Sequence, residues 1–288
     1  MARLYKYSGA GNDFVVLDGR TEDVSAYRTP ERIAALCDRT TGFIPSSAGL
    51  TGGSRPGADG LMILTDDPDY DFRMEYYNSD GSGGMMCGNG GRCIVAFADA
   101  LGLTPRDGRV FRFIAADGEH TGEILAREGK RKTVRIRMID VHTFHPALDG
   151  WFLDTGTRHF VRFVPDADAV DVETEGRQAR WNPVFAPIGA NANFVSVDPD
   201  GTLRVRTFEK GVEAETLACG TGITAAAIAA MLAHAPSTCH PERSEGSVHF
   251  DIQARIDRLA VAFRPLPDGS GFTDVYLTGP AEDIGRDA

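Results

Sequence analysis

The sequence predicts an α+β protein made of two similar halves. A chain of 288 residues suits one or two domains. Each half opens with two β-prone segments around a glycine turn, and each later carries a Cys-Gly-x-Gly motif before a helical segment, at Cys87 and at Cys219. The same features recur in the same order, which favours a duplicated unit over chance recurrence of short glycine motifs. We expect an N-terminal lobe of residues 1–128, with residues 278–288 returning to it, and a C-terminal lobe of residues 129–277.

In the first half, residues 4–17 are apolar and β-prone on both sides of the break at Gly9–Asp13, which predicts a strand, a turn and a second strand. A loop or insertion rich in Gly, Ser and Pro is expected at residues 43–57. A glycine-rich stretch covers residues 78–92. The remaining expected elements are a helix at 31–37, strands at 61–64 and 71–77, a helix at 93–101, and strands at 109–115, 122–126 and 133–138.

In the second half, residues 154–164 resemble residues 8–17, and residues 218–222 resemble residues 86–90. The Ala-rich run at 224–235 predicts the matching helix. Residues 236–249 are polar and contain two prolines, so an exposed insertion is expected there. Within it, Cys239 and His240 are adjacent ligand types, but two adjacent ligands are weak evidence, and we expect no metal site. A last strand is expected at 273–277, with residues 278–281 crossing back towards the first lobe.

Composition narrows the classes of protein. The net charge of −11 argues against a surface that binds nucleic acid or an anionic membrane, although a local pocket for a small anion stays open. No apolar run approaches the roughly 20 residues of a membrane span, and no signal peptide is recognisable at the start of the sequence. Five cysteines, an odd number, indicate reduced thiols in the cytoplasm.

The two cysteines of the repeated motif are candidates for chemistry. Cys87 and Cys219 each stand at or just before a predicted helix N-terminus, where backbone N–H groups and the helix dipole stabilise a thiolate or a bound carboxylate. The alternative is that both are small buried hydrophobes. Disulfide exchange is a rival use, but it normally employs Cys-x-x-Cys, which is absent. Cys93 is expected to pack in the core.

Two thiols that face one substrate suit a reaction with mirror-image demands. Racemisation at a Cα needs a base on one face and an acid on the other, and two cysteines can exchange these roles with direction. The carbanion needs donors for its carboxylate, which two helix N-termini supply.

Asparagine is scarce, and four of its six positions lie in the motifs already described or in residues 189–194. Its uncharged donors and acceptor suit an amino-acid head group, although a turn-forming role is the alternative. Glu209 and Lys210 precede Cys219 at about the separation of Asn78 from Cys87. They could pair with an ammonium and a carboxylate, or form an ordinary solvated ion pair.

Four segments together resemble the diaminopimelate epimerase family. They are Ser8-Gly-Ala-Gly-Asn-Asp-Phe14, Cys87-Gly-Asn-Gly-Gly-Arg-Cys93, Glu209-Lys-Gly-Val212 and Glu215-Thr-Leu-Ala-Cys-Gly-Thr-Gly222. The resemblance covers nearly the whole chain apart from the two insertions. It implies two pseudo-symmetric lobes, each a mixed barrel-like β-sheet around a central helix, with the active site in the cleft between them. It also implies interconversion of LL- and meso-2,6-diaminopimelate without a cofactor, in lysine and peptidoglycan biosynthesis.

The resemblance also implies the site residues. Cys87 and Cys219 would be the acid/base pair, and His159 and Glu209 would support them. The expected substrate-binding residues are Asn12, Asn78, Gly88, Asn89, Thr157, Asn191, Glu209, Lys210, Gly220 and Thr221.

Three positions depart from the family pattern. Lys210 replaces the usual Arg, which exchanges a bidentate fork for a point charge. Thr157-Arg158 stands where the family usually has a residue and Pro before the histidine, so the loop shape is open. Gly60 occupies a position where some members have a substrate-contacting glutamine, and no contact is expected there.

Several alternatives stay open from the sequence. A racemase for a proline-like substrate is the nearest enzymatic rival, and an amino-acid-binding or redox-sensing protein is the rival from another class. A pyridoxal phosphate racemase needs a Schiff-base lysine, and none of the four lysines lies in a recognisable site. The expected partner is the small-molecule substrate, and a homodimer is left open. We also expect Cys87 and Cys219 to lie close enough to oxidise to a disulfide when no substrate is bound.

Overall fold

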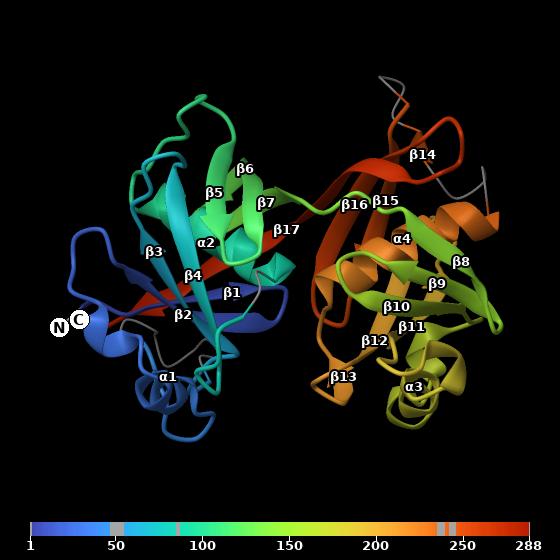
Figure 1. Cartoon of the computed structure of the whole chain (residues 1–288), viewed down its shortest axis with the longest axis horizontal. Helices are drawn as coiled ribbons and strands as arrows, with labels where there is room; N and C mark the ends of the chain where they lie inside the picture. The colour runs from blue at the N-terminus through green and yellow to red at the C-terminus, as the bar shows by residue number, and fades with distance from the viewer. Residues whose placement is uncertain (1, 47–54, 85–86, 235–239, 242–245, 288) are drawn as a thin grey trace. The chain divides into compact units, whose positions relative to one another are not determined.

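The computed structural model describes residues 2–46, 55–84, 87–234, 240–241 and 246–287. It divides into two compact units, one of Met1–Ile136 with Gly279–Ala288 and one of Arg137–Thr278 (Figure 1). The first boundary lies after Ile136 rather than after residue 128, because the strand at residues 131–137 pairs with the strand before it in the first unit. In the described parts of the chain, no helix is long and apolar enough to cross a membrane.

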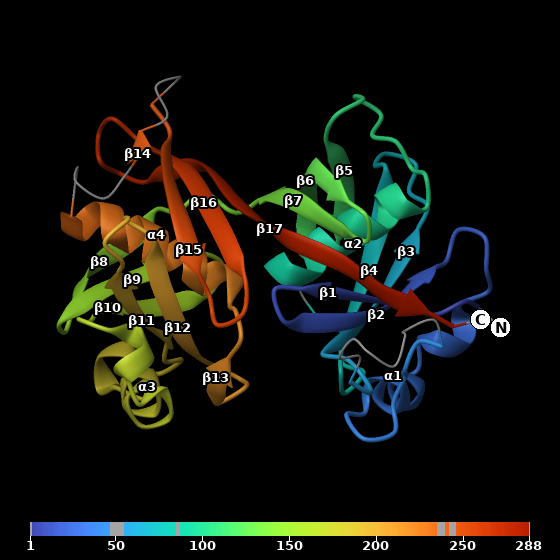
Figure 2. The ribbon, with the colours of Figure 1, turned by 180° about the vertical axis from the view of Figure 1, so that it is seen from behind.

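The first unit is a closed ring of eight strands. The strands are β1 (Tyr5–Gly9), β2 (Asn12–Asp18), β3 (Gly60–Thr65), β4 (Phe72–Asn78), β5 (Phe111–Ala115), β6 (Gly118–Glu128), β7 (Arg131–Arg137) and the second part of β17 (Phe272–Arg286). Each pairs with the next in that order, and β17 pairs with both β7 and β1, so the ring closes (Figure 2). The pairs β2–β3 and β4–β5 are parallel and the others are antiparallel.

Helix α2 (Gly88–Ala100) is the core of this ring, since every residue from Asn89 to Ala98 is buried. Helix α1 (Pro30–Cys37) packs on the outside, where its Ile33 joins a core cluster with Val15 and Ile63 of the sheet. Thr29 begins α1 as expected of an N-cap, because its side chain accepts a hydrogen bond from the Arg32 N–H.

The second unit repeats this architecture. Its strands are β8 (Thr143–Ala147), β9 (Gly150–Asp154), β10 (Arg158–Phe163), β11 (Asn191–Val197), β12 (Leu203–Glu209), β15 (Val248–Gln253), β16 (Arg258–Pro265) and the first part of β17. Their pairing order, from β8 to β17, repeats that of the first unit when the first unit is taken in the order β17, β1, β2 and onward to β7. The parallel pairs fall at the same two places, with β10–β11 matching β2–β3 and β12–β15 matching β4–β5. Short β13 (Ala214–Thr216) and β14 (His240–Pro241) pair with β12 and β15.

Helix α4 (Gly220–His234) is the central helix of the second unit, with Ile223 and residues 225–230 buried. Helix α3 (Val172–Arg180) packs outside, where Gly176 lies so close to Phe208 that an added Cβ would come within 2.4 Å of it. The described residues also contain three short 3-10 helices, η1 (Ser25–Tyr27), η2 (Ala167–Ala169) and η3 (Pro183–Phe185). The predicted α+β fold of two similar barrel-like lobes, each around a helix, is confirmed.

Two local expectations were wrong. Both central helices begin earlier than residues 93 and 224, at the glycine that follows each motif cysteine. The tail of the expected insertion at 236–249 belongs to the sheet, because β14 pairs with β15 and Val248 is buried. Cys239 lies outside the described residues.

Candidate active site

Cys87 caps the buried helix of the first unit. Its backbone is extended, with φ −99° and ψ 146°, and its Sγ accepts a hydrogen bond of 3.2 Å from the Gly90 N–H. The first turn of a helix has N–H groups that no helical carbonyl can take, and the dipole there favours a negative charge. A Cβ on Gly90 would lie 3.4 Å from this sulfur and 3.4 Å from Met62 Sδ, so the first turn of α2 packs closely against both sulfur atoms.

The predicted residues of this unit gather at one end of the barrel. Gly9, at the end of β1, lies against the first turn of α2, since an added Cβ would be 2.8 Å from the Asn89 carbonyl oxygen. Asn12 begins β2 directly opposite Gly9. Two strands further along, Asn78 ends β4 opposite Gly60. The side chain of Asn78 is exposed and donates to Ser82 Oγ at 3.0 Å.

Asn12 and Asn89 form a continuous hydrogen-bonded chain. Asn89 Nδ2 donates to Asn12 Oδ1 at 2.5 Å, and Arg92 Nη2 donates to Asn89 Oδ1 at 2.8 Å. Arg92 is fully buried and its Nε donates to the Pro280 carbonyl of β17 at 3.2 Å. The Asn89 side chain is therefore committed to holding Asn12, and its backbone N–H in the first turn of α2 is the group that suits an anion.

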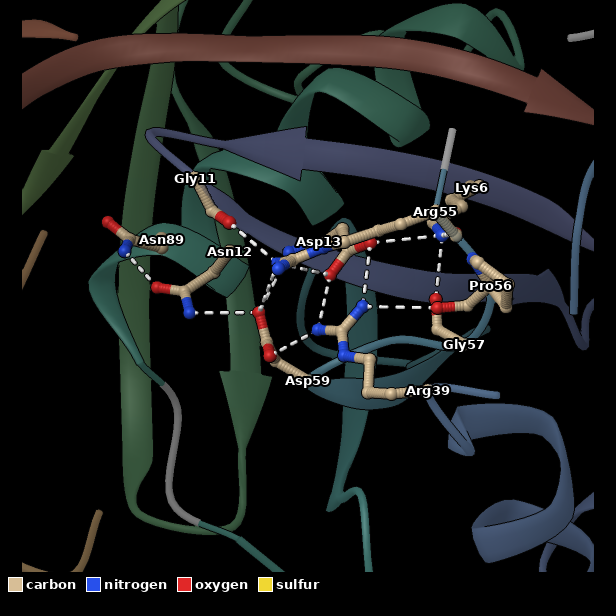
Figure 3. Close-up of polar contacts among 10 residues, drawn as sticks. All are labelled: Lys6, Gly11, Asn12, Asp13, Arg39, Arg55, Pro56, Gly57, Asp59 and Asn89. Atoms are coloured by element: carbon tan, nitrogen blue, oxygen red, sulfur yellow. Dashed lines mark hydrogen bonds and ion pairs between the residues drawn. The ribbon is translucent and has the colours of Figure 1, made fainter. Parts of the chain in front are cut away.

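A cluster of charged residues holds Asn12 from the other side (Figure 3). Asp59 Oδ2 accepts from Asn12 Nδ2 at 3.0 Å and from the Asp13 N–H at 3.1 Å. Arg39 binds both Asp59 and Asp13, and buried Lys6 pairs with Asp13 Oδ2 at 2.9 Å.

Burial disfavours the Asp13 carboxylate, but the hydrogen bonds from Arg39 and Lys6 outweigh it and hold the pKa of Asp13 below its usual value. Lys6, Asp13, Arg39 and Asp59 therefore form a charged cluster that holds the Asn12 side chain in place through Asp59. Sequence analysis did not identify Lys6, Arg39 or Asp59 as part of this region. A lysine in the apolar pattern of β1 is the signal that could have pointed to it.

Gly60 has no room for a side chain. A Cβ there would lie 2.6 Å from the Tyr77 carbonyl oxygen and 3.0 Å from the Tyr76 ring.

Cys37 and Cys93 differ from Cys87 in their surroundings. Burial raises the pKa of Cys37 to about 12, and complete burial of Cys93 on α2 raises its pKa further. Both thiols are therefore poor candidates for acid/base work near neutral pH.

Cys219 holds the corresponding place in the second unit. It directly precedes α4, and its carbonyl accepts from the Ile223 N–H at 2.8 Å. The residue is 8 % exposed. Its Sγ lies 3.4 Å from Thr221 Oγ1, a hydroxyl in the first turn of the helix.

His159 lies behind Thr221. It is fully buried on β10, and its Nε2 is 2.9 Å from Thr157 Oγ1 and 3.0 Å from Thr221 Oγ1. Burial lowers the pKa of His159 to about 3, so the imidazole is neutral near neutral pH. Its Nδ1 lies 3.1 Å from Asn193 Nδ2. Like Lys6, Arg39 and Asp59 in the first unit, Asn193 was not assigned to the site by sequence analysis.

Asn191 connects two of the other predicted residues. Its Nδ2 donates to the Arg158 carbonyl at 2.8 Å and approaches Thr157 Oγ1 at 3.5 Å, and its Oδ1 accepts from the Lys210 N–H at 2.7 Å. Glu209, the last residue of β12, and Lys210 are both half-buried. Asn191 thus fixes the backbone on which Lys210 is carried.

Within each unit, some of the predicted residues contact one another near the start of the central helix. Hydrogen bonds join Asn12 to Asn89 in the first unit, and Thr157, His159, Thr221 and Cys219 in the second. Asn78 has its own contacts in the turn after β4. What this arrangement offers chemically is a thiol beside the N-terminus of a buried helix, once in each unit.

Comparison with known proteins decides the family. A family model described as diaminopimelate epimerase matches residues 4–134 and 151–262. The chain belongs to the diaminopimelate epimerase family. It is 37 % identical over 282 residues to the diaminopimelate epimerase of Flavobacterium psychrophilum, covering 98 % of each chain. It is 38 % identical over 285 residues to that of Chlorobaculum tepidum, covering 97 % of this chain and 98 % of the relative.

Solved structures support the fold of this epimerase family member. A phenazine biosynthesis protein of the PhzF family from Bacillus anthracis superposes with a TM-score of 0.71 at 13 % identity, over 99 % of this chain and 97 % of that one. A probable proline racemase from Agrobacterium radiobacter has a TM-score of 0.63 at 17 % identity, over 100 % and 92 %. At these identities the likeness concerns the fold alone.

Proposed function

We propose that this chain interconverts LL-2,6-diaminopimelate and meso-2,6-diaminopimelate without a cofactor, using Cys87 and Cys219 as the two acid/base residues. The observation that carries the proposal is their equivalence. Each cysteine directly precedes the buried central helix of its own barrel, at the same place in a duplicated pairing order. Family membership supplies the substrate. The reaction would take place in the cytoplasm and serve lysine and peptidoglycan synthesis.

The chemistry follows from the two thiols. One is a thiolate that removes the hydrogen from Cα and becomes a thiol, while the electron pair of the C–H bond moves onto the carboxylate. The other thiol donates its proton to the opposite face of Cα and becomes the thiolate. The reverse reaction exchanges the two roles, so no external acid or base is consumed.

The first turns of α2 and α4 suit the negative charge that develops on the carboxylate. The first turn of α2 contains the N–H groups of Gly88 and Asn89, and the first turn of α4 contains those of Gly220 and Thr221. N–H groups in a first helical turn face the N-terminal end of the helix. Donors held in place before the reaction stabilise the developing charge most in a water-poor site. Asn12, Asn78, Asn191, Glu209 and Lys210 would bind the remaining amino and carboxylate groups of the substrate.

The test is deuterium incorporation at Cα in heavy water, with dialysed protein and no added cofactor. Starting from the LL isomer, early meso product is expected to carry deuterium while the remaining substrate does not, because the proton is delivered by the second thiol. Cys87→Ser and Cys219→Ser are each expected to lower isomerisation at least a hundredfold, the size of a general acid/base contribution. Cys93→Ala, a matched change at a buried thiol on α2, should leave the rate within a few-fold of wild type.

Turnover of proline analogues with none of diaminopimelate would refute the substrate. Binding of diaminopimelate without deuterium incorporation would refute catalysis. A disulfide between Cys87 and Cys219 stays a prediction, to be tested by mass spectrometry after mild oxidation and by recovery of activity with reductant.

A further inference from the structure

Six polar side chains in the second unit form one hydrogen-bonded chain that ends at Cys219. Its members, in order, are Thr207, Asn193, His159, Thr157, Thr221 and Cys219. The separations along it are 2.9 Å, 3.1 Å, 2.9 Å, 3.1 Å and 3.4 Å, and His159 also lies 3.0 Å from Thr221. Asn193, His159 and Thr207 are buried, so water cannot readily replace these partners.

The direction of the chain is set at Asn193. Its Nδ2 lies 3.0 Å from the Phe160 carbonyl oxygen, which can only accept a hydrogen bond, so the amide nitrogen must face that way. Its Oδ1 then faces the Thr207 hydroxyl, which donates to it at 2.9 Å. With the nitrogen so placed, the second N–H of the amide points at His159 Nδ1, and this ring nitrogen has to be the acceptor.

The tautomer of His159 follows from this. Burial lowers the pKa of His159 to about 3, so the ring carries one proton at neutral pH. Because Nδ1 accepts from Asn193, that proton is on Nε2. Nε2–H therefore donates to the hydroxyl oxygen of Thr157 or of Thr221.

The two hydroxyls pass the direction on. When Thr157 accepts from His159 and donates to Thr221 at 3.1 Å, the hydrogen of the Thr221 hydroxyl is available for Cys219 Sγ. When His159 donates to Thr221 directly, that hydrogen can go to Cys219 Sγ or to Thr157 Oγ1. Thr155 Oγ1 donates to the Thr221 carbonyl at 2.9 Å and holds this backbone in place. A hydrogen aimed at sulfur favours the thiolate over the thiol.

We propose that Asn193 is a positioning residue for Cys219: by fixing the Nε2–H tautomer of His159, it orders a chain of hydrogen bonds whose hydrogens all point towards the Cys219 sulfur. This inference rests on the proposed function, in which Cys219 is one of the two acid/base residues. A further observation agrees with it. A Cβ on Gly222 would lie 2.4 Å from Asn193 Oδ1 and 3.3 Å from His159 Cε1, so only glycine lets the first turn of α4 approach this pair.

The first measurement is the tautomer itself. A two-bond ¹H–¹⁵N spectrum of the full-length wild-type protein at pH 7 separates protonated from bare ring nitrogens, and comparison with His159→Gln assigns the signals of His159. We expect a neutral ring with the proton on Nε2. A proton on Nδ1, or a doubly protonated ring, would overturn the proposal, and this result needs no variant to fold beyond the one used for assignment.

The second measurement is the reactivity of the sulfur. Iodoacetamide alkylation of Cys219 at pH 7 is followed by peptide mass spectrometry, with Cys87 in the same molecule as the internal reference. Thr221→Val removes the donor to sulfur, and a hydrogen bond to a charged group is worth a tenfold to hundredfold change in thiolate population. We therefore expect Cys219 alkylation to slow at least tenfold relative to Cys87.

Two further variants separate this role from a structural one. Thr221→Ser keeps the hydroxyl and is expected to alkylate at close to the wild-type rate. Thr224→Val removes a buried hydroxyl of the same helix that donates to the Gly220 carbonyl instead, and should change the Cys219 rate less than twofold. Asn193→Leu is expected to slow alkylation as Thr221→Val does and to mix the two His159 tautomers.

An unchanged Cys219 rate in Thr221→Val would overturn the proposal. Neither measurement depends on turnover. Loss of the proposed function would appear as absent deuterium exchange with the tautomer intact, whereas failure of this inference would leave deuterium exchange intact.

Discussion

Replacing Lys6 by methionine tests the charged cluster that holds Asn12. Lys6 is 1 % exposed, and its ammonium contacts Asp13 Oδ2 at 2.9 Å and the carbonyl oxygens of Arg55 and Gly57 at 2.5 Å and 2.6 Å. Methionine fills much of the same volume but carries no charge and no donor. The change therefore isolates the polar role of this side chain.

The expected loss of stability is about 3–5 kcal/mol, because removing one partner of a buried ion pair leaves the other charge inadequately compensated. Three contacts shift the estimate within that range. Arg39 still binds Asp13, which favours the lower end. The Gly57 and Arg55 carbonyls lose a donor, which adds about 1 kcal/mol for each that water does not reach. For a unit of about 150 residues, the corresponding fall in Tm is roughly 6–20 °C.

The assay is thermal and urea unfolding of the wild type and Lys6→Met, followed by circular dichroism. Lys130→Met is the matched control, since Lys130 is exposed, and it should change the free energy of unfolding by less than about 0.5 kcal/mol. A loss below about 1 kcal/mol in Lys6→Met would show that Arg39 and Arg55 compensate Asp13 without Lys6 and would refute the reasoning.

Three other predictions concern the site. Asp59→Ala removes the acceptor of the Asn12 amide and is expected to lower kcat/KM for diaminopimelate about tenfold, a cost of about 1.4 kcal/mol, measured by deuterium exchange. Gly222→Ala brings a Cβ within 2.4 Å of Asn193 Oδ1, so this amide must turn, and we expect kcat to fall at least tenfold. The pKa of His159 is lowered to about 3, so below about pH 6.5 the unfolded chain binds a proton that the folded chain does not, and the free energy of unfolding falls as the pH falls. Between pH 6 and pH 4, His159→Gln should therefore lose about 2 kcal/mol less of its free energy of unfolding than the wild type does.

Each of these has a control or a contrary result. Asp69→Ala, at an exposed carboxylate, should leave kcat/KM unchanged. Gly83→Ala meets no atom within 4 Å of the added Cβ and should be silent in the same assay in which Gly222→Ala is not. Parallel acid-unfolding curves for wild type and His159→Gln would show that His159 titrates normally.

Much of the fold could be predicted because its signals are local. The glycines at Gly9–Gly11 and in the Cys-Gly-x-Gly motifs indicate a turn and a helix start from the local sequence alone. The recurrence of these motifs indicates the duplication. The helical conformation of residues 88–92 could not be predicted in this way. Gly88, Gly90 and Gly91 have poor helix propensity. They are helical because α2 is buried inside the barrel, where Gly90 lies against Met62 and tertiary packing outweighs propensity.

The candidate site divides in the same manner. By itself, the sequence determined which two cysteines stand at helix starts and which asparagines lie in the glycine motifs, since these depend on spacing along the chain. Only the tertiary structure decided what holds them. Asp59, directly before β3, accepts a hydrogen bond from Asn12 on β2, and Asn193 on β11 contacts His159 on the neighbouring strand β10. Hydrogen-bond partners are selected by distance and direction in three dimensions, and these contacts join residues more than thirty positions apart, so spacing along the chain carries no trace of them.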